Sequence, residues 1–239
     1  MSYLRKNNRK YDEIRHVQVL VDFCPNALGS VLYKCGNTQV ICAVSLASQV
    51  PQHAINKGQG WLTAEYTLLP YATNPRTERR ALRPDGRSVE IQRLIGRSLR
   101  AIIDLERIRD IALIVDCDVL QADGGTRTAA ISGAYIALQL AVRQLLQENI
   151  ISENPVIAQV AAISVGFIGD ELLLDLDYEE DSHCDIDMNL VMDSNKNIIE
   201  IQGTGEKRSY SMNELERMIA LAQSGIEKIF RIQNDILKL

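Results

Sequence analysis

The sequence predicts an α/β protein of the two-layer, α+β type, with two similar halves that each combine a β-sheet with a helix. Three observations predict it: strand-like segments fill the first third, long helical segments follow, and the second half repeats sheet and then helix. The chain has 239 residues, 46% of them hydrophobic, which suffices for a full core and excludes a disordered protein. We find no sequence repeat between the halves and treat residues 1–239 as one domain.

The first half opens with segments that alternate between apolar and polar residues or border a tight turn. Residues 16–23 (HVQVLVDF) alternate as a half-buried strand does. A Gly-Asn pair at 36–37 is a hairpin turn signal between strands predicted over 29–35 and 38–46. Residues 60–69 (GWLTAEYTLL) predict a further strand.

The middle of the chain predicts a loop, two helices and a strand between them. Residues 73–88 are polar, contain two prolines and lack apolar periodicity, as a long exposed loop does. A helix is predicted from Ser88, because apolar residues follow at helical spacing. These residues are Ile91, Leu94, Ile95, Leu99, Ile102 and Ile103. Residues 110–120 are nearly all apolar and predict a strand buried on both faces, and residues 124–126 (GGT) begin a helix that runs to about Leu146.

The second half predicts two hairpins and a last helix. Turn residues at 169–170 and at 194–197 each join two strand-like segments. The four segments are 160–168, 171–177, 185–193 and 198–205. The last helix is predicted to start at Ser211, where Glu214 completes a capping box.

Composition excludes several classes of protein. No run reaches the roughly 18 apolar residues of a membrane span, and the polar, basic start MSYLRKNNRK lacks the apolar core of a signal peptide. We therefore expect a cytoplasmic protein with no membrane partner. The five cysteines form no CxxC pair and the three histidines show no ligand spacing, so we expect reduced, packed thiols rather than a zinc site.

Charge is segregated along the chain. The net charge of −5 argues at first against a nucleic-acid partner. Residues 76–100, however, hold eight arginines and three acidic residues, whereas residues 171–187 hold eight acidic residues and no lysine or arginine. Two solvated faces would give this pattern. Arginine makes bidentate contacts with phosphate and close carboxylates are best tolerated around a cation, so an anionic polymer and a metal ion would give it too.

The segment ADGGTRTAA, residues 122–130, predicts an anion site. Its two glycines allow a tight turn, and the helix that follows directs backbone N–H groups and its positive end at that turn. Arg127 adds a fixed charge and Thr126 a hydroxyl donor, and Arg87 could reach the same anion from the start of an adjacent helix. The alternative is a plain glycine turn with a threonine cap. A triphosphate-binding P-loop is excluded, because the GK[ST] ending is absent.

The acidic segment 177–189 (DYEEDSHCDIDMN) predicts a metal site. Asp181 and Asp187 are six residues apart, and Asp185 would share a face with Asp187 if 185–189 is a strand. Converging carboxylates suit Mg²⁺, which keeps several waters and bridges phosphate oxygens. A solvated acidic turn is the alternative, and an EF-hand is excluded because its glycine and its terminal glutamate are missing.

Long motifs throughout the chain resemble those of the ribonuclease PH family. They are GNTQVICAVSL, KGQGWLTAEYTLLPYATNPRTERR, GRSVEIQRLIGRSLRAIIDL, DCDVLQADGGTRTAAISGA, AAISVG, LLLDLDYEEDSHCDIDMN and EIQGTGE. The resemblance implies a phosphorolytic 3′-to-5′ exoribonuclease that trims tRNA precursors, with inorganic phosphate as co-substrate, on a fold like domain 2 of ribosomal protein S5. It also implies a homo-hexamer, a trimer of dimers. Phosphorolysis conserves the bond energy, so the reverse extension of RNA 3′ ends is expected, and a role in ribosomal RNA 3′ processing is left open.

The resemblance implies roles for individual residues of this chain. In the family, the arginine of GRxxEIQ and the Gly-Thr-Arg of GGTRTA bind the attacking phosphate. The corresponding residues here are Arg87, Gly125, Thr126 and Arg127. The two aspartates of the family's EDxxxxxDMN segment support Mg²⁺ and catalysis, which implies both roles for Asp181 and Asp187. An arginine loop grips the tRNA in the family. The corresponding residues here are Arg76, Arg79 and Arg80.

Three positions depart from the family's pattern. RKNNR at 5–9 stands where the family has an RxDGR-type motif, and we interpret the similar RPDGR at 83–87 as chance. Tyr71 stands where arginine is common, which would weaken one RNA contact, and Cys184 replaces a small apolar residue. None of these is a phosphate or metal position, so the resemblance still implies an active enzyme.

Two rival functions make different demands on the same residues. A catalytically silent RNA-binding ring subunit would keep the arginine loop and lack the anion pocket or the paired aspartates. A hydrolytic, metal-dependent nuclease would release nucleoside monophosphates without added phosphate, and it would leave Arg87 and Arg127 without a purpose.

Overall fold

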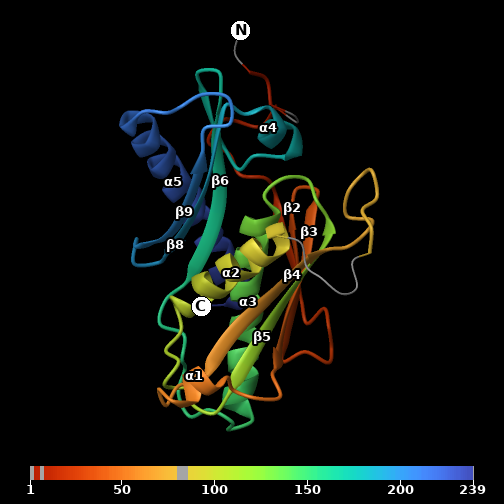
Figure 1. The fold of residues 1–239 in the computed structure, drawn as a ribbon, viewed down its shortest axis with the longest axis vertical. Coiled ribbons are helices and arrows are strands. Elements are labelled where there is room, and N and C mark those ends of the chain that lie inside the picture. The colour runs from red at the N-terminus through yellow and green to blue at the C-terminus, as the bar shows by residue number, and fades with distance from the viewer. Residues whose placement is uncertain (1–2, 6–7, 80–85, 239) are drawn as a thin grey trace.

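The computed structural model describes residues 3–5, 8–79 and 86–238. Within this part of the chain, strands and helices follow one another in two successive groups (Figure 1). The strands are β1 (Val17–Val21), β2 (Gly29–Cys35), β3 (Thr38–Leu46), β4 (Trp61–Leu68), β5 (Ala112–Gln121), β6 (Val160–Ile168), β7 (Glu171–Leu174), β8 (Ile186–Asp193) and β9 (Ile198–Thr204). The helices are α1 (Gln52–Ile55), α2 (Gly86–Arg100), α3 (Thr126–Gln147), α4 (Tyr178–His183) and α5 (Met212–Leu237).

The first group of strands forms a five-stranded sheet in the order β1-β2-β3-β5-β4. Neighbouring strands are antiparallel except β4 and β5, which run parallel because α2 lies between them in the chain and crosses over the sheet. Helix α2 packs on β4, and α3 packs on β2 and β3 (Figure 1). Every second residue of β3 from Thr38 to Val44 is buried, as expected for a sheet that is covered on one face.

Strand β5 overturns one prediction. The apolar run at 110–120 predicted burial on both faces, yet only one face is closed. Val115 and Cys117 are buried there, whereas Asp116 and Asp118, which alternate with them, are half-buried on the other face. The helices cover a single side of the first sheet, so the apolar composition of β5 exceeds what its burial requires.

The second group forms an antiparallel sheet in the order β7-β6-β8-β9, against which α5 packs. Strand β6 is buried along nearly its whole length because it has neighbours on both faces. Val160 and Ala162 belong to the core around α3, and Val165 belongs to the core around α5. The start of α5 is confirmed as predicted: Glu214 N donates to Ser211 Oγ at 3.2 Å, and Ser211 N donates to Glu214 Oε2 at 2.8 Å.

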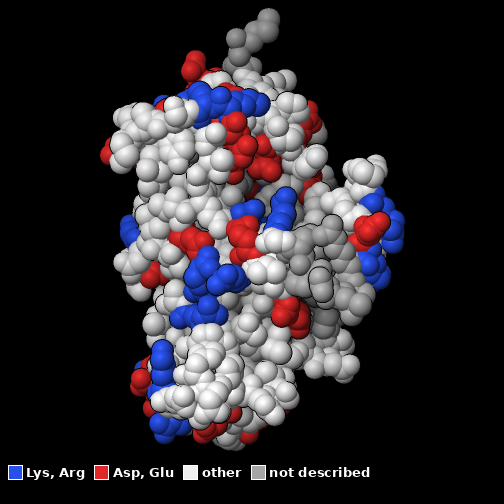
Figure 2. Space-filling view, viewed as in Figure 1, with Lys and Arg blue, Asp and Glu red and all other residues white. Residues whose placement is uncertain are grey.

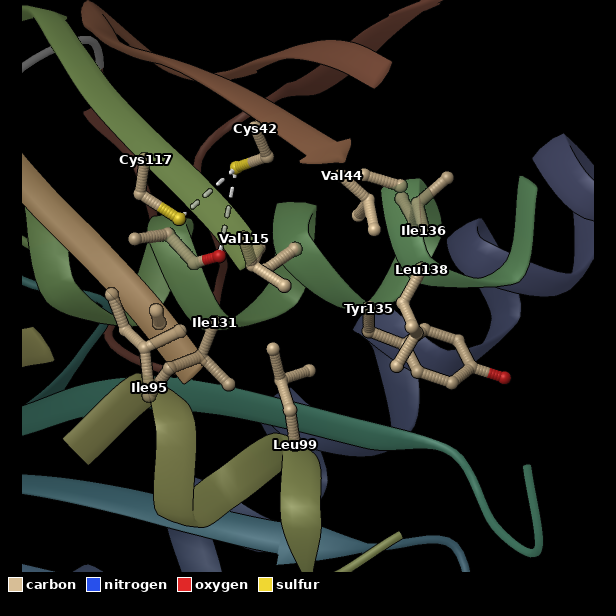
Figure 3. Packing of buried hydrophobic residues seen from close by; sticks show 14 of the residues in the cluster. Cys42, Val44, Ile95, Leu99, Val115, Cys117, Ile131, Tyr135, Ile136 and Leu138 are labelled. Atoms are coloured by element: carbon tan, nitrogen blue, oxygen red, sulfur yellow. Dashed lines mark hydrogen bonds between the residues drawn. The ribbon is translucent and has the colours of Figure 1, made fainter. Parts of the chain in front are cut away.

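Helix α3 is the centre of the larger core. Ile131 and Ile136 are fully buried on it, among side chains of the first sheet and α2 (Figure 3). Cys42 and Cys117 lie on adjacent strands facing α3, with their Sγ atoms 3.9 Å apart, and all five cysteines are free as predicted. Among the described helices, α3 alone has the length and hydropathy of a membrane span, but 78% of its most apolar window is buried inside the protein. Its apolar character is therefore that of a core helix.

The predicted hairpins, α3 and α5 are confirmed, and differences lie around α2 and in two short helices. Helix α2 begins at Gly86, two residues before the predicted Ser88, and ends at Arg100. Ile102 and Ile103 therefore lie beyond the helix, although both are buried. The sequence does not predict α1 and α4, because helices of 4 and 6 residues are too short to show an apolar period.

Candidate active site

A cleft of about 1010 Å³ lies where the turn before α3, the helix α4 and the loop after β4 meet. It collects the residues that the sequence assigned to phosphate and to metal. They are Arg87, Gly125, Thr126, Arg127, Asp181 and Asp187. Figure 2 shows the hollow, with acidic side chains along one wall and basic side chains beside them. Side chains from both halves of the chain are thus brought to one site.

The turn that ends β5 and begins α3 depends on its two glycines. Gly124 and Gly125 have φ angles of 72° and 62°, a conformation that favours glycine. A Cβ on Gly124 would lie 2.5 Å from the carbonyl carbon of Asp177, so the backbone of the turn touches the start of α4 directly. As N-cap of α3, Gly125 offers no side chain to the first N–H groups, and an anion in the cleft can take that role.

Thr126 lies on the floor of the cleft with Tyr66 behind it. The Tyr66 hydroxyl donates to Thr126 Oγ1 at 2.8 Å. Burial raises the pKa of Tyr66 to about 12, against the opposing charges of Arg87 and Arg127, so the hydroxyl stays protonated at neutral pH. The Thr126 hydroxyl hydrogen is therefore free to point toward an anion.

Arg127 reaches from α3 toward the second sheet. Its Nη1 donates to Gln202 Oε1 on β9 at 2.6 Å and lies 3.3 Å from Glu90 Oε1 on α2. Gln202 in turn donates to the same Glu90 oxygen at 2.8 Å. These contacts orient the guanidinium and involve only one of its nitrogens, so further N–H donors remain for an anion in the cleft.

Asp181 lies on the short helix α4, where its side chain is exposed at the cleft. Asp177 and Glu180 form a capping box: Glu180 N donates to Asp177 Oδ1 at 2.9 Å, and Asp177 N donates to Glu180 Oε2 at 3.0 Å. Burial raises the pKa of Asp181, and the charges of Arg87 and Arg127 oppose that rise. The guanidinium groups of the phosphate side thus act electrostatically on the carboxylate of the metal side.

Asp187 lies on β8 and has an unsatisfied oxygen. Its Oδ1 is buried and has no hydrogen-bond partner among the described residues. Burial, followed by the negative charges of Asp181 and Glu206, raises the pKa of Asp187 to about 6. A cation would satisfy the oxygen and reduce the repulsion between the carboxylates. The residues therefore fit Mg²⁺, which protein sites often hold by only one or two carboxylates.

Two features limit the kind of metal site. The described part of the chain contains no group of three or more His, Cys, Asp or Glu side chains placed to hold a metal, so waters and substrate oxygens would complete the coordination. Asp185, which the sequence paired with Asp187 on one face, precedes β8 instead. It accepts from Gly169 N at 2.9 Å and lies 3.7 Å from Lys207 Nζ, outside the cleft lining.

Three arginines of the N-terminal segment lie behind the cleft. Arg5 Nε donates to Glu180 Oε1 at 2.7 Å, and Arg9 Nη2 donates to Glu180 Oε2 at 2.8 Å. Arg15 Nη2 donates to Asp175 Oδ1 at 2.7 Å. Arg5 and Arg9 are the two ends of the RKNNR segment, so its departure from the family's motif keeps both arginines in place on Glu180.

The arginines predicted to bind RNA lie on the loop after β4. Arg76 and Arg79 are exposed and make no ion pair with any residue that the structure describes. Thr77 and Glu78 line the edge of the cleft, and Arg80 lies outside the described residues. The loop projects from the body of the protein, and Figure 2 shows basic side chains gathered on it.

Two family models match this chain in sequence. One is described as the 3′ exoribonuclease family, domain 1, and matches residues 13–144; the other is domain 2 of the same family and matches residues 158–225. The chain belongs to the 3′ exoribonuclease family. Its relatives include the ribonuclease PH of Neisseria gonorrhoeae, 48% identical over 239 residues, which are 99% of this chain and 98% of that protein. The ribonuclease PH of Crocosphaera subtropica is 46% identical over 237 residues, 99% of each chain. The predicted family, and with it an enzyme, are confirmed.

Solved structures confirm the predicted fold class. The 3′ exoribonuclease fold of this chain superposes on rice Rrp46 with a TM-score of 0.81 and 18% identity, covering 98% of this chain and all of that one. An Archaeoglobus fulgidus exosome with RNA bound to the active site gives a TM-score of 0.80 and 23% identity, over 95% of this chain and 91% of that one. At these identities the likeness concerns the fold, which is the α/β arrangement of the type seen in domain 2 of ribosomal protein S5.

Several cleft residues were missed by sequence reasoning in this exoribonuclease. Glu206 and Lys207 line the cleft, and Glu206 lies in the EIQGTGE motif, which was a signal for it. Tyr178 also lines the cleft, and its position directly before the acidic pair Glu179-Glu180 gave no indication of that. Tyr66, which lies behind the cleft, gave no indication either, because its contact with Thr126 joins positions 60 residues apart.

Proposed function

We propose that this protein is a phosphorolytic 3′-to-5′ exoribonuclease that trims the 3′ ends of tRNA precursors with inorganic phosphate. The observation that carries the proposal is the single cleft lined by Arg87, Thr126 and Arg127 together with Asp181 and Asp187. Arginines at a helix N-terminus suit a free phosphate, and two carboxylates suit the metal ion that assists attack on a phosphodiester.

The chemistry follows from where the phosphate would be held. Arg87, Thr126 and Arg127 bind inorganic phosphate, one oxygen of which attacks the phosphorus of the last phosphodiester in line. A new P–O bond forms as the bond to the 3′ oxygen breaks, and that oxygen takes up a proton from water. The products are a nucleoside 5′-diphosphate and an RNA one nucleotide shorter. Phosphate is already an anion at neutral pH, so the reaction needs no strong base.

Asp181 and Asp187 are the residues that would hold Mg²⁺. The buried Oδ1 of Asp187, which has no partner in the described part of the chain, supports this assignment. The ion would supply charge neutralisation at the phosphorus oxygens as negative charge builds there. The positive charges of Arg87 and Arg127 would also favour ionised carboxylates in the cleft, since they lower the pKa of Asp181 against the effect of burial.

RNA binding is assigned to the exposed loop. Arg76 and Arg79, with Arg80 in the same loop, would contact the tRNA backbone through phosphate. We propose a homo-hexamer, a trimer of dimers, in which loops of neighbouring subunits form basic surfaces despite the net charge of −5. The fold is shared with an exosome that holds RNA in its active site, which supports an RNA partner. We further propose a cytoplasmic location, a reverse reaction that extends RNA from nucleoside diphosphates, and ribosomal RNA 3′ ends as a second substrate.

One assay separates this proposal from its rivals. A tRNA with a short 3′ extension is incubated with Mg²⁺, with and without phosphate, and the released nucleotides are identified. We expect nucleoside diphosphates, and only when phosphate is added. Monophosphates released without phosphate would indicate a hydrolytic nuclease. RNA binding with no nucleotide release in either condition would indicate a catalytically silent ring subunit.

A further inference from the structure

One arginine links the turn at residues 123–125, here called the phosphate turn, to the segment that carries the acidic residues of the cleft. Arg15 precedes β1, and its side chain is only 8% exposed. Its Nη1 donates to the backbone oxygen of Asp123 at 2.6 Å and lies 3.4 Å from the backbone oxygen of Gly124. One edge of the guanidinium is therefore bound to the backbone that leads directly into Thr126 and Arg127.

The remaining donors of Arg15 bind a single carboxylate. Asp175 Oδ2 accepts from Arg15 N at 2.7 Å and from Nε at 3.1 Å, and Asp175 Oδ1 accepts from Nη2 at 2.7 Å. Asp175 lies just after β7, two residues before Asp177, the N-cap of α4. The other edge of the guanidinium is thus bound to the segment that leads into Asp181.

The turn and this segment have no room to slide past each other. A Cβ on Gly125 would lie 2.8 Å from Arg15 Nη2, and a Cβ on Gly124 would lie 2.7 Å from Tyr178 N. The turn is also held to β3, because Thr38 Oγ1 donates to Gly124 O at 2.7 Å. The two backbone segments are already in contact at Gly124, and the Arg15 guanidinium packs against Gly125 and bonds to both segments, so it holds them together.

We infer that Arg15 is a positioning residue for phosphate: paired with Asp175, it fixes the phosphate turn at the distance from α4 that the reaction requires. It acts through the turn, since it lies behind Gly124 and Gly125 rather than among the residues that line the cleft. The inference rests on the proposed function of that turn. Lysine cannot replace the fork, because its single ammonium cannot bind both segments at once.

The test compares Arg15→Lys with Arg5→Lys in steady-state phosphorolysis. Arg5 is also buried and ion-paired, but its bonds go to Glu180 and to the backbone oxygens of Leu174 and Asp175, and none goes to Asp123 or Gly124. We expect Arg15→Lys to lower kcat/KM for phosphate roughly 10- to 100-fold, the loss typical of a reactant misplaced by about 1 Å. The KM for RNA should change less than about twofold in both variants, and kcat/KM for phosphate should hold within about threefold in Arg5→Lys.

Assays run at 20 °C, below the melting temperature of each variant, separate positioning from folding. A second variant, Asp175→Asn, removes the other half of the pair and should lower kcat/KM for phosphate in the same direction; with Arg15→Lys its effect should be less than additive. If Arg15→Lys does not fold, Asp175→Asn alone decides. Variants that lose melting temperature and keep the wild-type kcat/KM for phosphate would overturn the inference.

A readout without turnover separates this inference from the proposed function. Phosphate alone should raise the melting temperature of the wild-type protein, because a ligand that binds the folded state stabilises it. The rise should be smaller in Arg15→Lys at the same phosphate concentration. A wild-type protein that shows neither this rise nor diphosphate release contradicts the proposed function itself. A rise equal in wild type and Arg15→Lys contradicts only the role of Arg15.

Discussion

The charged groups behind the cleft and those in and around it differ in how completely they are paired. Behind it, Arg5, Arg9 and Arg15 bind two buried carboxylates through bonds of 2.7 to 2.8 Å. In the cleft, Asp187 keeps a buried oxygen without a partner among the described residues, and Arg76 and Arg79, on the loop whose Thr77 and Glu78 line the cleft, are exposed. Charges that are matched within the chain hold the fold, whereas unmatched charges are available to a metal ion, phosphate or RNA.

The difference corrects what net charge suggested. The chain is acidic overall, at −5, which argued against RNA. Internal ion pairs do not change that total, but they remove Asp175 and Glu180, with their N-terminal arginines, from the charges that a partner can contact. A binding partner contacts the charged groups that are not ion-paired within the chain, and these are arginines on the loop and carboxylates in the cleft.

The largest expected effect comes from removing an unmatched charge. Asp187→Asn should lower kcat by about 10³-fold, because the variant loses a metal-binding carboxylate where transition-state charge is neutralised. RNA binding should be largely intact, and the melting temperature should not fall, since the buried Oδ1 of Asp187 has no hydrogen-bond partner among the described residues and the negative charge is repelled by Asp181 and Glu206. Single-turnover assays and thermal melts measure both quantities.

A neighbour supplies the control for Asp187→Asn. Asp185 lies two residues away, pairs with Lys207 and does not line the cleft, so Asp185→Asn should keep kcat within a few-fold of wild type. Full activity of Asp187→Asn would remove its assignment as a metal ligand. Equal losses in both variants would show a general effect on β8.

Removing a matched charge should act on stability instead. Asp175→Asn should lower the free energy of unfolding by about 3 kcal/mol, because it leaves the buried Arg15 without its counter-charge. Burial alone would raise the pKa of Asp175, but the charge and hydrogen bonds of Arg15 outweigh it and lower the pKa below its usual value. A lowered pKa in the folded state means stability that is present above the unfolded value and lost as the pH falls through the folded one.

The pH dependence therefore checks the same pair. The difference in unfolding free energy between wild type and Asp175→Asn should be constant near neutral pH and shrink below about pH 4, where the unfolded carboxyl takes up its proton. Urea unfolding at pH 7 and at pH 3 measures it. A difference that does not change with pH would mean that the charge of Asp175 contributes nothing beyond its shape.

The sequence predicted the separate elements of the cleft better than the way they are joined. The turn at Gly124-Gly125 and the two aspartates each have a local pattern, and both lie in the cleft as expected. Helix α4 was missed, because six residues are too few for a period and its capping box lay within an acidic run. Arg15 left no signal at all, since its partner lies 160 positions away and only the packing of the two sheets brings them together.

The burial of β5 shows a second limit of the sequence. An apolar run predicts that a strand is covered, but the number of covering layers depends on where the helices pack. Here α2 and α3 lie on one side of the first sheet, so Asp116 and Asp118 stay half-buried on the other. The fold class could be predicted from periodicity, whereas the closure of each face required tertiary structure.

A smaller effect is expected on the exposed loop. Changing Arg76, Arg79 and Arg80 to alanine together should weaken tRNA binding roughly 10-fold at moderate salt and reduce the slope of log K against log salt by about 2 to 3. Arg76 and Arg79 are exposed and make no ion pair with the described residues, so they contribute little to the fold and the melting temperature should change by less than about 2 °C. Binding measured at several salt concentrations tests this, and an unchanged slope would contradict contacts between these arginines and the phosphate backbone of tRNA.

The smallest effect should come from an ion pair that is exposed to solvent. It tests whether the buried pairs behind the cleft contribute to stability because they are ion-paired or because they are also buried. Arg107 Nε lies 3.1 Å from Asp104 and 3.7 Å from Glu153, and Arg107 Nη1 donates to Asn154 O at 2.9 Å, but the Arg107 and Asp104 side chains are 43% and 36% exposed. Arg107→Gln should cost less than about 0.5 kcal/mol, because water screens the pair and the free side chain regains rotamers. It should leave kcat/KM for phosphate unchanged. Urea unfolding of Arg107→Gln and Asp175→Asn, measured side by side, gives the comparison. An equal loss of unfolding free energy in both variants would show that ion pairing alone, without burial, accounts for the contribution of Arg15 and Asp175.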